Sequence, residues 1–310
     1  MHKISDKIII CSFYKFILIN NTDFIKKLIY EASKRLSVVG TVLISKEGIN
    51  GTLAGNKKSI RKIEKIIKNN INDKIEFKFF QNSFLPFLKL KIKIKNEIVK
   101  LGEENLEPGK ITGKYINPKD WDDFIEDNNI ILLDTRNEYE HKIGHFKRAV
   151  FPRIKNFSDF PNWFKKNKSF LLNKKIATYC TGGIRCEKAT SFLIKNGFKN
   201  VFQLQGGILN YLSQKKNQES AWNGECFVFD DRVSVNKSLQ KGKYVQCFAC
   251  KSPISKEDLL SKYYQKGISC HKCFSSTSSK KKDGLAERQK QIKLAQKRGI
   301  KHLGFHNFKS

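Results

Sequence analysis

The sequence contains no long apolar run. Its longest candidate, Ile8 to Ile19, is interrupted by Ser12 and Lys15, whereas a membrane-spanning helix needs about 18 consecutive apolar residues. The same segment lacks a cationic leader and a small-residue cleavage site, so it does not resemble a secretory signal peptide. We therefore expect a cytoplasmic protein that has no membrane partner.

Acidic residues are scarce relative to basic ones. The chain has 60 Lys and Arg but only 29 Asp and Glu, which gives a formal charge of +31. This excess favours a polyanionic partner, because Lys and Arg release condensed counterions when they neutralise phosphates. Lys, Ile, Asn and Phe are all abundant, so an AT-rich genome could also account for part of it. We interpret the charge as favouring a nucleic acid, with a merely solvated basic surface as the alternative.

With 310 residues, the chain is longer than one hydrophobic core usually organises, so we expect two or three domains. Residues 1–100 alternate strand-like and helix-like patterns, which predict an α+β domain with the ferredoxin-like order βαββαβ. Gly48, Asn50 and Gly51 are predicted to form a turn between two of its strands. The predicted strands cover 7–14, 38–45, 50–54 and 75–80, and the predicted helices cover 22–36 and 57–69.

A linker rich in Gly and Pro, residues 101–117, precedes a second predicted domain at residues 118–215. Apolar runs at 130–134, 175–180 and 201–204 alternate there with helical patterns, which predicts an α/β domain with a parallel sheet. Functional loops of such sheets follow the carboxyl ends of the strands. Asp134 and Cys180 both stand at such ends.

The remaining chain is expected to form a Cys-rich segment, residues 216–274, and a basic tail, residues 275–310. The tail has ten Lys and Arg against two acidic residues, with a helical pattern near Gly284 to Arg298. We expect this tail to be flexible and solvated, although it could still contact an RNA backbone.

Eight cysteines without a secretory signal indicate a reducing compartment, where Cys pairs more often bind metals or act in catalysis than form disulfides. Two C-x2-C pairs, separated by 19 residues, have the spacing that places four thiolates around tetrahedral zinc. Four protein ligands leave no open position, so this zinc would be structural. The alternative is a thiol cluster without metal. The predicted ligands are Cys247, Cys250, Cys270 and Cys273.

Cys180 is the candidate nucleophile. It follows a predicted strand and precedes a glycine-rich loop that ends at Arg185 and leads into a predicted helix. Inward-turned backbone N–H groups and the helix N-terminus would make this loop an anion cradle that favours the thiolate. Arg185 would add positive charge or orient the loop through backbone carbonyls. The alternative is an inert buried cysteine beside a structural turn. The cradle residues are Thr181, Gly182, Gly183 and Ile184.

Cys180 with Arg185 five positions later resembles the six-residue active-site loop of rhodaneses. Three flanking segments support the resemblance: residues 134–140, 144–149 and 204–211. It implies that Asp134 and Arg136 hold the loops in place and do no chemistry. Cys-dependent phosphatases fit less well, because their loops place one more residue between Cys and Arg.

Outside this domain, the sequence is similar to the rhodanese-domain tRNA uridine hydroxylases. Residues 46–52, 180–186 and 222–230 and the late Cys pairs occur in the same order in that family, so the resemblance extends from Lys7 to Cys273. It implies that the protein hydroxylates carbon 5 of the wobble uridine, with molecular oxygen as co-substrate and the tRNA anticodon stem-loop as partner. It implies no certain catalytic cofactor, and nothing in the sequence indicates the oligomeric state.

Cys186 stands six residues after Cys180, near enough to act as a resolving thiol, although it could simply pack inside the helix. Uridine chemistry suggests that the Cys180 thiolate adds to carbon 6 and makes carbon 5 enolate-like, so that it reacts with oxygen without a metal. Two alternatives remain open. One is a sulfurtransferase that carries a Cys180 persulfide, and the other is an RNA-binding module with a vestigial loop.

Overall fold

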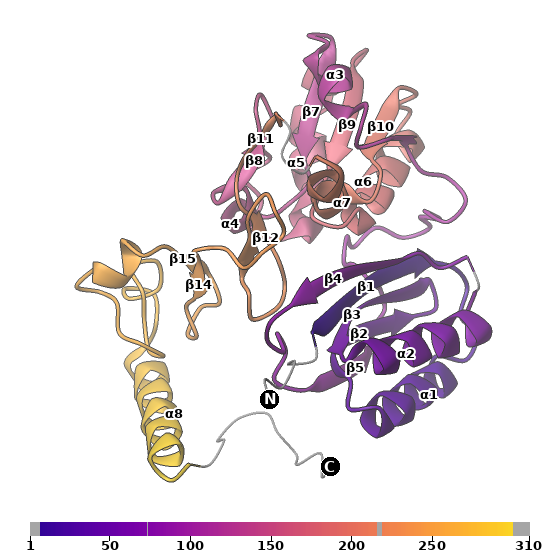
Figure 1. The fold of residues 1–310 in the computed structure, drawn as a ribbon. Coiled ribbons are helices and arrows are strands. Elements are labelled where there is room, and N and C mark those ends of the chain that lie inside the picture. The colour runs from indigo at the N-terminus through magenta and orange to yellow at the C-terminus, as the bar shows by residue number, and fades with distance from the viewer. Residues whose placement is uncertain (1–6, 73, 216–218, 300–310) are drawn as a thin grey trace.

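The computed structural model describes residues 7–72, 74–215 and 219–299. Figure 1 shows an N-terminal α/β unit, a second α/β unit stacked on its sheet, and a C-terminal segment that runs out to one side and ends in a long helix. Within the described ranges, no helix is both long and apolar enough to cross a membrane.

The N-terminal domain has the predicted ferredoxin-like fold with one additional edge strand. Its five-stranded sheet has the order β4-β1-β3-β2-β5, in which β5 runs parallel to β2 and the other neighbours are antiparallel. Both helices cover one face of the sheet, where Ile and Val side chains form the core. The elements are β1 (Ile8–Phe16), α1 (Thr22–Arg35), β2 (Val39–Ser45), β3 (Gly48–Gly55), α2 (Lys57–Asn70), β4 (Phe77–Asn82) and β5 (Leu90–Ile94).

The prediction that Asn50 and Gly51 form a turn is wrong. Both lie inside β3 and pair with Tyr14 and Phe13 of β1, while the turn consists of the two residues between β2 and β3. Gly51 is required for packing, because a Cβ atom there would lie 2.6 Å from the ring of Phe13.

The central domain contains a parallel four-stranded sheet with the order β6-β10-β9-β7, as predicted. Aromatic side chains fill the core on both sides of it, with Trp121, Tyr211 and Trp222 in one cluster and Phe160 and Phe164 in the other. The elements are β6 (Lys114–Ile116), α3 (Trp121–Glu126), β7 (Ile130–Asp134), α4 (Glu138–His141), β8 (Gly144–Phe146), α5 (Phe160–Leu171), β9 (Lys175–Tyr179), α6 (Ile184–Lys195), β10 (Val201–Leu204) and α7 (Gly207–Gln214).

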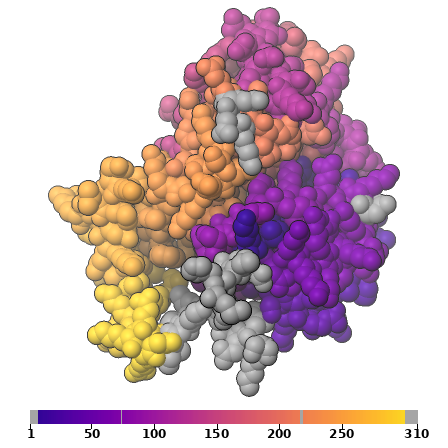
Figure 2. All heavy atoms as spheres, in the orientation of Figure 1, coloured from indigo at the N-terminus to yellow at the C-terminus, as the bar shows by residue number. Residues whose placement is uncertain are grey.

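The C-terminal segment first packs on the central domain and then leaves it. Strand β11 (Trp222–Gly224) pairs with β8, and the ring of Trp222 lies edge-on against Phe146. The Asp231 N–H then donates to the Pro86 carbonyl of the N-terminal domain. In Figure 2 this orange segment continues along the side of both domains. Its remaining elements are β12 (Cys226–Phe227), β13 (Ser234–Val235), β14 (Val245–Gln246), β15 (Pro253–Ile254) and α8 (Ser279–Lys297).

Helix α8 is the helical segment expected near Gly284 to Arg298, and it buries none of its residues. Residues 300–310 of the predicted basic tail lie outside the described residues.

A buried lysine joins the two α/β domains. Lys188 of α6 is 1% exposed, and its Nζ lies 2.8 Å from Glu47 of the β2–β3 turn and 2.6 Å from Glu97. Glu47 also accepts a hydrogen bond from the Ile98 N–H, and Asn50 donates to the Ile98 carbonyl. The sequence segment 46–51 therefore docks the N-terminal domain on the helix that follows the Cys180 loop.

We predict that Lys188→Ala lowers the free energy of unfolding by about 2 to 3 kcal/mol, because it leaves two neighbouring carboxylates without their cation. Denaturant unfolding measures this change. Lys199→Ala, at an exposed position, should have an effect below about 0.5 kcal/mol. Equal stability of the Lys188 variant and the wild type would show that the ion pairs do not hold the domains together.

Candidate active site

The Cys180 loop joins the carboxyl end of β9 to the N-terminus of α6. The Gly183 N–H donates to Cys180 Sγ at 3.1 Å, as expected for a cradle that holds a thiolate. Gly183 has φ of +103°, a left-handed conformation that favours glycine. The loop is fastened from behind by the turn into α7, because the Ile208 and Leu209 N–H groups donate to the carbonyls of Cys180 and Thr181.

The surroundings of Cys180 favour its thiolate. Burial alone would raise its pKa, but a hydrogen bond from the Cys186 thiol, the charge of Arg185 and the backbone N–H groups of Cys186 and Gly183 hold the pKa of Cys180 well below its ordinary value. Burial and the neighbouring Cys180 raise the pKa of Cys186 well above its ordinary value, so that Cys186 remains the donor. The structure thus brings together the two cysteines that the sequence paired.

Arg185 acts on the loop through a carboxylate. Its guanidinium makes a two-pronged ion pair with buried Glu140 of α4, with N···O distances of 2.6 and 2.7 Å. The Thr181 hydroxyl donates to the same carboxylate at 3.1 Å. Arg185 therefore fixes the loop and lowers the pKa of Cys180 by its charge. The orientation through backbone carbonyls considered from the sequence is not the arrangement found, because Glu140 takes that place.

Asp134 and Arg136 form a second buried ion pair below the loop. Arg136 Nη2 lies 2.7 Å from Asp134 Oδ2, and the same oxygen accepts from the Tyr179 hydroxyl at 2.8 Å and lies 2.8 Å from His141 Nδ1. Burial would raise the pKa of Asp134, but Arg136 and His141 hold it well below its usual range. Arg136 also donates to the Gly144 carbonyl, so the pair ties β7 to β8. This geometry suits the supporting role expected for both residues.

A cleft of about 1130 Å³ lies between the N-terminal sheet and the Cys180 loop. Side chains alternate along a strand, so the residues of β1 and β4 that do not face the helices point into this cleft. Lys78 Nζ donates to the Gly206 carbonyl at 2.7 Å and lies 3.4 Å from that of Gly182. Burial lowers the pKa of Lys78 to about 8. Lining residues from the three parts of the chain include Ser12, Tyr14, Lys78, Cys180, Glu187 and Phe229.

Sequence reasoning missed the contribution of the N-terminal domain to this site. The signal was present as alternation in β1, where Cys11 and Phe13 join the core while Ser12 and Tyr14 line the cleft. Such alternation identifies two faces of a strand but not the partner of the second face. The approach of Tyr14 to the loop depends on domain docking.

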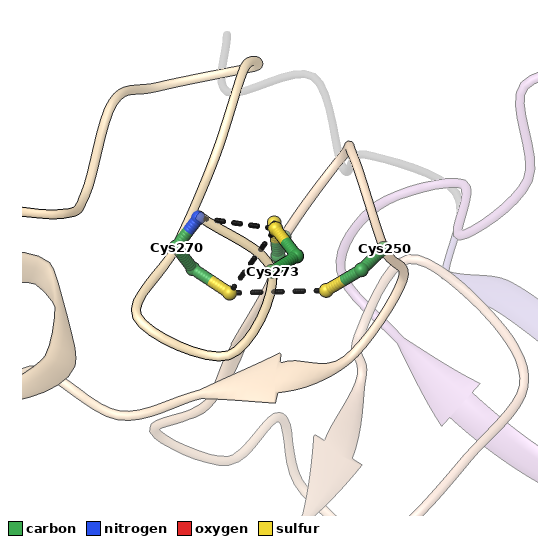
Figure 3. Close-up of side chains that lie close together, drawn as sticks. Cys250, Cys270 and Cys273 are labelled. Atoms are coloured by element: carbon green, nitrogen blue, oxygen red, sulfur yellow. Dashed lines mark hydrogen bonds between the residues drawn. The ribbon is translucent and has the colours of Figure 1, made fainter. Parts of the chain in front are cut away.

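The four late cysteines form a compact cluster, and Figure 3 shows three of them directed at one another from two turns. All four sulfur atoms lie within 4.8 Å of one another, and Cys250 and Cys270 are 3.7 Å apart. Tetrahedral zinc with Zn–S bonds of about 2.3 Å requires sulfur separations of about 3.8 Å. The cluster could therefore bind a metal such as zinc. His271 instead directs Nδ1 at Asp258, 3.3 Å away.

We predict that Cys180 is a thiolate at neutral pH. The thiolate absorbance near 240 nm, measured as the difference between the wild type and Cys180→Ser, should titrate well below the ordinary thiol pKa of about 8.5. Cys186→Ala should raise the midpoint, because it removes a hydrogen-bond donor to the sulfur. A wild-type midpoint at or above that of free cysteine would contradict the described electrostatics.

Comparisons with known proteins agree with this architecture. Residues 8–98 match the UPF0176 acylphosphatase-like domain, and residues 117–214 match the rhodanese-like domain. Rhodanese-like domains are catalytic cysteine enzymes, so the second match supports an enzyme.

Among solved structures, the chain is similar to three proteins. A rhodanese-related protein from Thermoplasma volcanium is 24% identical, with 34% of this chain and 95% of that one covered and a TM-score of 0.28. A rhodanese-like domain from Anabaena sp. is 18% identical, with 36% and 80% covered and a TM-score of 0.30. An acylphosphatase from Coxiella burnetii is 10% identical, with 28% and 94% covered and a TM-score of 0.23. The two matching domain models, taken in this order along the chain, give the protein the architecture of the UPF0176 family, which fits the family that its cysteine loop and flanking motifs indicated.

Proposed function

We propose that the protein is a tRNA-modifying oxygenase that hydroxylates carbon 5 of the wobble uridine with molecular oxygen. The observation that carries this proposal is the position of the Cys180 thiolate, which lies in a cleft large enough for a nucleotide and is faced by a second domain. A persulfide alone would need far less space. The domain pair of the UPF0176 family is consistent with tRNA modification.

The cleft suits a base turned out of an anticodon loop. Aromatic side chains such as Tyr115 and Phe229, which are 52% and 64% exposed, offer surfaces on which a splayed base can stack. The formal charge of +31 supplies the phosphate contacts that position RNA without reading its sequence.

The chemistry begins with addition of the Cys180 thiolate to carbon 6 of uridine. This step forms the S–C6 bond and moves an electron pair toward carbon 5 and the carbon 4 carbonyl. Molecular oxygen accepts that pair and a proton, which gives a hydroperoxide at carbon 5. Backbone N–H groups of the cradle and the charge of Arg185 oppose the cost of developing negative charge.

Cys186 then completes the redox balance. Its sulfur attacks the outer peroxide oxygen, which leaves a hydroxyl on carbon 5 and forms a sulfenic acid. Loss of the carbon 5 proton breaks the S–C6 bond and releases 5-hydroxyuridine. The Cys180 thiolate condenses with the sulfenic acid to a disulfide and water, and an external dithiol reduces that disulfide. One molecule of oxygen and two thiols thus yield the product, a disulfide and water.

A sulfurtransferase is the second candidate, because the same N–H groups that hold the Cys180 sulfur would hold the outer sulfur of a persulfide. The two functions predict different products on tRNA. An RNA-binding module with a vestigial loop predicts no dependence on the thiol.

We predict that a deletion strain, and the same strain carrying Cys180→Ser, lack 5-hydroxyuridine derivatives in anticodon nucleosides analysed by mass spectrometry. The wild-type gene should restore them. A thiolated base that disappears instead would establish the sulfurtransferase, and full modification by Cys180→Ser would establish the binding module.

We also propose that the cysteine cluster holds one structural zinc ion. The four thiolates leave no open position, so the metal would stabilise the C-terminal segment without taking part in the reaction.

The purified protein should contain about one zinc per chain by elemental analysis. Cys250→Ser should lose it and lower the midpoint of thermal unfolding of the C-terminal segment, because metal affinity adds to folding free energy. His271→Ala is the matched control, since this neighbour faces Asp258, and it should retain the metal. Zinc-free wild type with unchanged stability would contradict the proposal.

A further inference from the structure

A buried carboxylate beside the Cys180 loop is held by two phenols. Glu187, in the first turn of α6, is 5% exposed. It accepts hydrogen bonds from the Tyr14 hydroxyl at 3.0 Å, from the Tyr115 hydroxyl at 2.9 Å and from the Gln203 amide at 3.3 Å. These partners come from β1, β6 and β10, so two domains converge on one side chain.

The cluster has the features of a proton site. An ordinary buried carboxylate is neutralised by a cation, whereas every side chain that donates to Glu187 is uncharged. Burial raises the pKa of Glu187, and the hydrogen bonds only partly oppose this change. Glu187 can therefore gain and lose a proton at less cost than a salt-bridged carboxylate.

Tyr14 connects this carboxylate to the reacting centre. Its hydroxyl gives its only proton to Glu187, which leaves the oxygen lone pairs free to accept from a substrate. A Cβ atom built on Gly183 would lie 2.7 Å from that oxygen, so Tyr14 sits directly over the cradle. The negative charge of Cys180 also contributes to the raised pKa of Tyr14, as expected for groups that share one site.

We propose that Tyr14 and Glu187 form the proton-transfer pair that removes the carbon 5 proton in the last step of the reaction. Tyr14 accepts the proton from carbon 5 while its own hydroxyl proton moves to Glu187. The C5–H electron pair becomes the C5–C6 double bond, and the S–C6 pair returns to Cys180. This inference rests on the proposed function and assigns the N-terminal domain a catalytic residue.

Tyr115 provides the matched control. It donates to the same carboxylate, but it is 52% exposed. Removing its hydroxyl leaves the Tyr14–Glu187 contact in place. The comparison therefore separates proton transfer through Tyr14 from general support of Glu187.

The test uses the full-length protein and a tRNA anticodon stem-loop with a wobble uridine. Tyr14→Phe and Glu187→Gln should each lower turnover by about 10²-fold or more, whereas Tyr115→Phe should lower it less than about tenfold. Because the last step is the one slowed, the covalent Cys180–RNA species on a denaturing gel should accumulate in the first two variants. Deuterium at carbon 5 should slow them further and leave the wild type nearly unaffected.

Two results would overturn the proposal. One is a Tyr14→Phe variant with normal turnover. The other is a variant in which turnover and covalent species fall together with no deuterium effect, because that pattern marks a merely structural residue. Failure of the proposed function itself looks different, since the wild type would then form no 5-hydroxyuridine. Denaturant unfolding of each variant checks that it is folded.

Discussion

The ion pair between Arg185 and Glu140 holds the Cys180 loop, and the rest of the site depends on that loop. With the loop fixed, Gly183 and Cys186 donate to one sulfur. The pair also makes Arg185 the first of four consecutive α6 side chains that have partners on other elements. A short stretch of helix thereby links the thiolate, the second thiol, the carboxylate and the docked domain.

The site is therefore a property of two domains. The central domain supplies the thiolate and its cradle, while β1 and β4 supply Tyr14 and Lys78. Lys188 keeps these strands in place through its two carboxylate partners. A rhodanese-like domain by itself would leave the loop open to water, whereas docking creates a bounded cleft in which a base can be held against the sulfur.

Much of the fold could be predicted from the sequence, because strand and helix periodicity, the parallel sheet and the Cys spacing are local signals. The Cys180 loop and its pairing with Cys186 follow from such signals too. The turn assigned to Asn50 and Gly51 failed because the packing of Gly51 against Phe13 is a contact between strands. Glu140, Tyr14 and Glu187 were missed as site residues for the same reason, since each depends on residues distant in sequence.

The most direct test of the central claim is covalent trapping on an anticodon stem-loop that carries 5-fluorouridine at the wobble position. Fluorine at carbon 5 cannot leave as a proton, so the adduct should persist. The account predicts an RNA–protein species that survives denaturation, maps to Cys180 by peptide mass analysis and is absent from Cys180→Ser. If the wild type hydroxylates normal uridine but never forms this species, addition of Cys180 to carbon 6 is contradicted.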